Sequence, residues 1–123
     1  MSVPNVLDID ESTSAVYTAT LQDETGTVIP SAAIDSITMT LTEMSGGEVV
    51  NSRNAQDVLN ANNCTMHATS GLFTWNVQPA DVAITLSTIA VDAKERHKAL
   101  ITVVWNTTKK MHRVIKFRIH NLA

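Results

Sequence analysis

Apolar and polar residues alternate along most of the chain. Between positions 36 and 42, one face carries Ile37, Met39 and Leu41, whereas the positions between them are serine or threonine. This alternation is typical of a half-buried β-strand. Threonine suits the polar face because its branched Cβ packs on a pleated surface while its hydroxyl contacts water. We therefore predict a strand over 36–42 whose three apolar side chains point into a core.

Strand-like segments recur along the rest of the chain. They lie at 15–21, 48–51, 65–69, 72–77, 98–105 and 111–120. Turn-forming residues separate several of them, at Ser45-Gly46-Gly47, at Ser70-Gly71 and over 106–110. The stretch 53–63 lacks the alternation and could hold a short helical turn. The stretch 80–95 could begin either a short helix capped near Asp81 or a strand.

These elements predict an all-β fold, an antiparallel immunoglobulin-like β-sandwich of about seven or eight strands. A parallel α/β fold is excluded because the crossover helices that it needs are missing. The length of 123 residues suits one domain, which we expect over 15–123 after an extended, acidic N-terminal arm over 1–14.

Composition excludes several classes of protein. No apolar run reaches about 18 residues, so we expect no membrane-spanning segment. The N-terminus lacks the basic and apolar regions of a signal peptide. One cysteine, Cys64, leaves no intramolecular disulfide and no multi-cysteine zinc site, and we interpret it as a buried thiol.

Charge is distributed unevenly along the chain. Residues 1–57 contain nine acidic residues and one basic residue, whereas residues 58–123 contain three acidic and eight basic residues. Interleaved strands could mix these charges into a neutral surface. Alternatively, the halves could form an acidic and a basic patch, which would favour head-to-tail docking or a charged scaffold.

The residues that could carry chemistry do not form a recognisable catalytic motif. Asp81, Asp92 and Glu95 could supply paired carboxylates, but catalysis also needs a cleft and a positioned partner. The histidines have no metal-ligand spacing, and we expect all four on the surface: His67, His97, His112 and His120. We therefore expect no enzyme, no cofactor and no metal ion.

The final strands offer the best binding feature. Their outward positions hold a basic row, Lys109, Lys110, His112, Lys116 and Arg118, which could contact phosphate or an acidic protein surface. Nucleic acid is not expected, because the aromatic residues that could stack on bases fall on inward faces: Phe73, Trp75, Trp105 and Phe117. Outward apolar residues complete the candidate interface, which then comprises Leu100, Val104, Val114, Lys109, Lys110, Lys116 and Arg118.

Several longer motifs resemble a known family. The segments are Leu21-Gln-Asp-Glu-Thr-Gly26-Thr-Val-Ile-Pro30, Ile34-Asp-Ser-Ile-Thr-Met-Thr-Leu41, and Gly71-Leu-Phe-Thr-Trp75-Asn-Val-Gln-Pro79-Ala-Asp81, with the loop 50–63 and the closing Ile119-His-Asn-Leu122. Together they resemble small immunoglobulin-like structural proteins in the virions of tailed bacteriophages, over about residues 15–122. The paired cysteines of antibody domains are missing, which removes their disulfide but not the sandwich.

The resemblance implies a virion structural or accessory protein without catalytic residues. It would dock in multiple copies on the head shell or at the head–tail junction, as a decoration, cement or connector protein. Its partners would be capsid, neck or tail proteins and further copies of itself, in virions assembled in the bacterial host cytoplasm. The arm over 1–14 could lie along a neighbour by strand addition. The alternative is a tail- or fibre-associated module whose loops recognise a carbohydrate or a host receptor.

Overall fold

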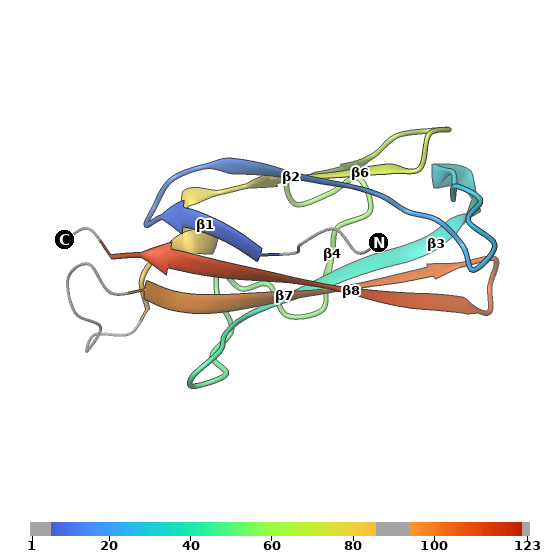
Figure 1. The fold of residues 1–123 in the computed structure, drawn as a ribbon. Helices are drawn as coiled ribbons and strands as arrows, with labels where there is room; N and C mark the ends of the chain where they lie inside the picture. The colour runs from blue at the N-terminus through green and yellow to red at the C-terminus, as the bar shows by residue number, and fades with distance from the viewer. Residues whose placement is uncertain (1–5, 86–93, 122–123) are drawn as a thin grey trace.

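The computed structural model describes residues 6–85 and 94–121, which form two sheets packed face to face (Figure 1). The larger sheet has the strand order β1-β8-β7-β3-β4 and the smaller has the order β2-β6-β5. The strands are β1 (Val6–Asp10), β2 (Ala15–Thr20), β3 (Ile34–Glu43), β4 (Gln56–Asp57), β5 (Cys64–Met66), β6 (Leu72–Val77), β7 (Lys94–Trp105) and β8 (Lys109–His120). Two short 3₁₀ helices, η1 (Ser31–Ala33) and η2 (Pro79–Val82), lie between strands.

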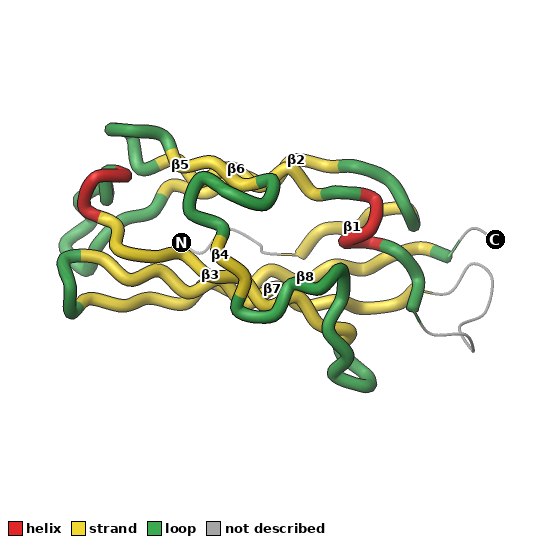
Figure 2. Tube along the Cα trace, turned by 180° about the vertical axis from the view of Figure 1, so that it is seen from behind, coloured by secondary structure: helices red, strands yellow, loops and turns green. Residues whose placement is uncertain are grey.

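The sandwich predicted from the alternation is confirmed. Ile37, Met39 and Leu41 are buried in β3, as expected. The core between the sheets centres on Trp75, whose ring meets that of Phe117 edge-on at a centroid distance of 5.4 Å. Trp105, the other tryptophan of the core, is also buried. Figure 2 shows the same two layers from behind, with loops at both ends.

The pairing of β1 with β8 is parallel, so the sheet is not purely antiparallel as predicted. Residues 6–10 belong to the expected arm, and as β1 they form an edge of the larger sheet. Leu7 and Ile9 pack against the core while Asp8 and Asp10 point outward. Apolar and polar residues alternate in β1 as in the other strands. Its apolar side chains pack against the core because this removes their surface from water.

The segment 48–58 differs most from prediction. The expected return strand over 48–51 is reduced to a single bridge, between Thr42 and Val49. Positive φ angles at Asn51, Ser52 and Ala55 prevent regular strand pairing. The segment instead covers the edge of β3 through separate hydrogen bonds, and β4 is only two residues long. The expected helical turn within 53–63 is replaced by β4 and turns.

The ambiguous stretch 80–95 contains parts of two elements. Asp81 lies in η2, where its carboxylate accepts a hydrogen bond from the Gln78 backbone N–H. The strand β7 begins at Lys94, four residues earlier than the predicted start at 98. The intervening residues 86–93, including Asp92, lie outside the described residues. In the described ranges, no helix has the length and hydropathy that crossing a membrane requires.

Candidate interaction surface on the β7–β8 hairpin

The β7–β8 hairpin has one face in the core and one face outside. Its two strands pair along their whole length, from Lys94 opposite His120 to Trp105 opposite Lys109. Side chains of a strand alternate between the two faces, and the odd-numbered residues Ala99, Ile115 and Phe117 are buried. The outward face is therefore a strip of even-numbered residues along β7 and β8, and these two strands run along most of the length of the molecule in Figure 1.

Four cations occupy one end of this strip. Arg96 lies directly opposite Arg118, and Lys98 lies directly opposite Lys116. All four side chains are exposed, and we call them the basic quartet. Like charges placed directly opposite each other destabilise a pair of strands. The arrangement therefore works against folding wherever no opposite charge offsets it.

A single carboxylate, that of Asp8 on β1, offsets part of this charge. Its oxygens lie 2.8 Å from Nη2 of Arg118 and 3.1 Å from Nζ of Lys94. The hydrogen bond from Lys94 and the nearby charge of Arg118 hold the pKa of Asp8 below its ordinary value. No ion pair joins Arg96, Lys98 or Lys116 to an acid within residues 6–85 and 94–121. The quartet therefore keeps a large excess of positive charge.

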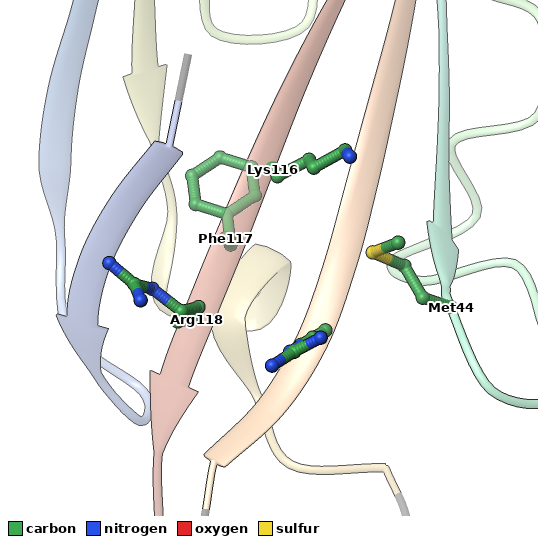
Figure 3. Close-up of a pocket in the computed structure, with 5 residues that line it drawn as sticks. Met44, Lys116, Phe117 and Arg118 are labelled. Atoms are coloured by element: carbon green, nitrogen blue, oxygen red, sulfur yellow. The ribbon is translucent and has the colours of Figure 1, made fainter. Parts of the chain in front are cut away.

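Three members of the quartet line a hollow of about 310 Å³ (Figure 3). It is lined by Met44, Arg96, Lys116, Phe117 and Arg118. In Figure 3, Lys116 extends toward β7 whereas Arg118 points toward β1. Met44 is partly exposed and adds an apolar side to the cationic groups. A concave site with this lining suits a carboxylate-bearing segment that also carries apolar carbon.

A tight turn after β3 holds Met44 in this position. The buried carboxylate of Glu43 accepts hydrogen bonds from the backbone N–H groups of Ser45, at 2.8 Å, and Gly46, at 2.6 Å. The Met44 N–H donates to the Arg96 carbonyl at 2.9 Å. Burial raises the pKa of Glu43, but these backbone donors outweigh it, so its pKa lies below the ordinary value.

We expect Glu43→Gln to destabilise the protein by about 1 kcal/mol at neutral pH, because the amide has one acceptor oxygen instead of two. A carboxyl whose pKa is lower in the folded state stabilises the fold above its unfolded pKa, and this contribution is lost as the pH falls through the folded pKa. Urea unfolding should therefore show a difference at pH 7 that shrinks in acid. The exposed Glu48→Gln is the matched control, and an equal loss at both pH values would contradict the assignment.

The structure separates the seven predicted interface residues into two groups. Lys116 and Arg118 lie in the quartet, and the directly opposed pair Leu100–Val114 lies in the next row of the same strip. The second group lies near the hairpin turn and consists of Val104, Lys109 and Lys110. Lys110 and Lys116 are six residues apart, or about 20 Å along a strand. The two groups therefore lie toward opposite ends of the strip.

Lys109 is also partly neutralised, because its Nζ lies 2.6 Å from Oε1 of Glu24. The hydrogen bond from Lys109 to Glu24 raises the pKa of the lysine. The surface pairs made by Asp8 and Glu24 each join the acidic first half of the chain to its basic second half. Strand interleaving thus mixes much of the charge, but within the described residues no ion pair reaches Arg96, Lys98, Lys116 or Lys110.

The predicted interface did not include Arg96, Lys98 or Met44. A signal for the first two was present, because Lys94, Arg96 and Lys98 alternate in the outward phase of the strand over 98–105. The inward positions between them hold Glu95 and His97, so the apolar half of the pattern was missing there. Met44 follows its strand and reaches the hollow only through the turn that Glu43 caps.

His97 is fully buried, which corrects the prediction that all four histidines lie on the surface. Its Nε2 lies 2.5 Å from Oε2 of Glu95, and its Nδ1 lies 3.1 Å from the Asp81 carbonyl. Glu95 also accepts hydrogen bonds from the Thr85 N–H at 3.0 Å. These contacts attach the start of β7 to η2. They also surround the Glu95 carboxylate with hydrogen-bond donors.

The remaining candidate groups are also held by the fold. Asp81 is buried and binds Arg53, so neither it nor Glu95 forms an open acid–base pair. Burial raises the pKa of the Cys64 thiol to about 12, in agreement with the predicted buried thiol. The part of the chain that the structure describes contains no group of three or more His, Cys, Asp or Glu side chains able to hold a metal ion.

Comparison with solved structures supports the fold. The chain is similar to the structure titled "Crystal Structure of the Periplasmic Chaperone SfaE", with a TM-score of 0.53 and 8% sequence identity. The match covers 98% of this chain and 55% of that chain, so this chain spans about half the length of that protein. No protein-family model and no curated protein sequence matches the chain. At this identity the likeness concerns the fold, and the chain has an immunoglobulin-like β-sandwich.

Proposed function

We propose that this protein is a structural module of a phage virion that docks, in multiple copies, on an acidic surface of another virion protein. The contact surface is the outward face of the β7–β8 hairpin, comprising the basic quartet and the Leu100–Val114 pair. The observation that carries this proposal is the opposition of like charges in the quartet, because an anionic partner would relieve that repulsion.

The virion setting rests on the sequence motifs that resemble phage structural proteins, including Gly71-Leu-Phe-Thr-Trp75 and Pro79-Ala-Asp81. The position on the head shell or the head–tail junction is part of the same proposal. The sandwich acts as a rigid spacer in this proposal, because β7 and β8 are each 12 residues long and pack on a buried core. The copy number per particle, measured relative to the major capsid protein, distinguishes decoration of the shell from a role at the junction.

Docking depends on the quartet in this proposal, and the double variant Lys98→Gln/Lys116→Gln tests that dependence. We expect its stability to be unchanged or higher, because it removes one like-charge pair. We expect its incorporation into particles to fall at least about tenfold. Incorporation is measured by quantitative mass spectrometry of purified particles after complementation with the variant gene.

The matched control is Lys109→Gln/Lys110→Gln, which removes the same charge from the turn end of β8. This control should be incorporated like the unmodified protein. Equal incorporation of the two double variants would contradict the proposed surface. Loss of incorporation together with a lower unfolding midpoint in the quartet variant would indicate a folding defect instead, and would also contradict it.

The alternative, a module that binds a carbohydrate or receptor through its loops, has one structural feature in its favour. A hollow of about 210 Å³ near the β7–β8 turn is lined in part by Asp23, Trp105 and Asn106. However, Trp105 is only 5% exposed, so it offers little surface for stacking on a sugar ring. We therefore favour docking through the β7–β8 face, and a glycan-binding screen separates the two functions.

A further inference from the structure

Exposed strand edges invite pairing with other chains, and most edges of this sandwich are closed. The segment 48–58 covers the edge of β3, where the Leu41 N–H donates to the Arg53 carbonyl at 2.8 Å. The loop before β5 covers the outer edge of that strand. There the Met66 N–H donates to Oδ1 of Asn60 at 2.7 Å. The β3 side of the larger sheet and the outer edge of β5 in the smaller sheet are therefore protected from pairing with another chain.

The opposite edge of the larger sheet is protected by charge. The outer edge of β1 carries Asp8 and Asp10, two carboxylates on the same side of a short strand. Pairing of this edge with another copy of itself would bring carboxylates close together, which is unfavourable.

Among the described residues, nothing protects the outer edge of β2 in either way. The Leu21 N–H donates to the Gly71 carbonyl at 2.8 Å, and this bond continues the antiparallel pairing of β2 with β6. Residues of a strand direct their backbone groups alternately to the two sides. Val16, Thr18 and Thr20 therefore direct their N–H and C=O groups away from β6, and none of these groups has a partner in the described part of the chain.

The surface beside this edge is uncharged. The outward side chains of the smaller sheet are Val16, Thr18, Thr20, Thr65, Leu72, Thr74 and Asn76. Val16 is 63% exposed, which is unusual for a branched apolar side chain. Twofold pairing brings equal charges of the two copies together near the axis, so an uncharged face favours pairing with its own copy, whereas the face with the basic quartet opposes it.

From these observations we infer that two copies of the chain associate through β2. The strands pair antiparallel about a twofold axis at Thr18, so that Thr18 lies opposite Thr18 of the other copy. Val16 then lies opposite Thr20 of the other copy, and the outward donors and acceptors of both strands are satisfied. The two smaller sheets join into one continuous sheet. This inference is independent of the proposed function, because it uses the sheet opposite the quartet.

Sedimentation velocity over a range of concentrations tests the association. The interface is small, so we expect a reversible dimer with a Kd in the micromolar range. Thr18→Lys places two ammonium groups opposite each other and should weaken the dimer at least about tenfold. Thr65→Lys is the matched control: Thr65 lies in the same row of the sheet, two strands away, and this variant should still dimerise. A protein that stays monomeric up to about 1 mM overturns the inference.

Engineered cysteines test the register. In an antiparallel pair of strands, two opposed residues that exchange backbone hydrogen bonds have Cα atoms about 5.5 Å apart. This distance is within the range of a disulfide. Thr18→Cys should therefore form a disulfide-linked dimer under mild oxidation, whereas Val16→Cys and Thr65→Cys should not. The native Cys64 is buried and does not compete. A dimer that Thr18→Lys leaves intact, or equal cross-linking of all three cysteine variants, contradicts pairing through β2.

Discussion

Replacing Arg53 with methionine is expected to lower the free energy of unfolding by about 3–5 kcal/mol. Arg53 is only 2% exposed, and its Nε and Nη2 donate to the two carboxylate oxygens of the fully buried Asp81, at 2.6 and 3.2 Å. Loss of the guanidinium leaves that carboxylate buried beside few remaining donors. The loss is a large part of the total stability of a domain of this size. Urea unfolding monitored by tryptophan fluorescence measures it.

Arg53 also organises the segment that covers β3. Its Nη1 donates to Oε1 of Gln56, at 2.8 Å, and to the Asn62 carbonyl, at 3.0 Å. Arg53→Lys keeps the charge but not the forked geometry, and it should lose a substantial part of the stability. The double variant Arg53→Met/Asp81→Leu removes both charges and should be more stable than Arg53→Met. If the single and double variants were equally unstable, the unpaired carboxylate would not be the cause.

The second large effect is expected for Trp75→Ala, which should destabilise the protein by about 3–5 kcal/mol. Trp75 is fully buried, meets the Phe117 ring edge-on, and lies 5.7 Å from the guanidinium carbon of Arg53. Its removal leaves a cavity between the sheets and takes away the aromatic surface on which Arg53 rests. Thermal unfolding followed by far-ultraviolet circular dichroism measures the change.

Trp75→Phe is the matched variant for this position. It keeps an aromatic ring in the core and removes the indole N–H, which is buried and has no hydrogen-bond partner among the described residues. We therefore expect a much smaller loss than for Trp75→Ala. A similar loss for both variants would mean that the packing of an aromatic ring against Phe117 is not what stabilises the core.

The inward faces of the strands could be predicted from sequence because burial imposes a local pattern. In β3, Ile37, Met39 and Leu41 alternate with polar residues, and all three are buried. The alternation failed where polar groups replace apolar ones inside the protein. Glu43, Glu95 and His97 occupy inward positions, and hydrogen bonds stabilise each of them there. Glu43 bonds the turn that follows it, Glu95 bonds Thr85, and His97 bonds the Asp81 carbonyl. Such compensation leaves no periodic signal.

Only part of the candidate surface could be predicted, because alternation shows which residues face outward but not which residues lie opposite them. The outward phase of β8 correctly brought Lys116 and Arg118 to one face, beside Val114. Their opposition to Lys98 and Arg96 depends on the register of the β7–β8 hairpin, which the turn over 106–108 determines. Lys109 has the same charge as its neighbours in the basic row, yet it pairs with Glu24 from a distant loop.

The sequence by itself determined which side is buried in the strands with apolar inward positions, and hence that the protein is a β-sandwich with Trp75, Trp105 and Phe117 inside. That information is local, because side chains of an extended segment alternate whatever strand lies beside it. The tertiary structure decided which strands are neighbours, which charges of the basic quartet have an acidic partner, and which edge, that of β2, is left open among the described residues. Those properties arise from pairing between distant segments, where register and strand order set every contact.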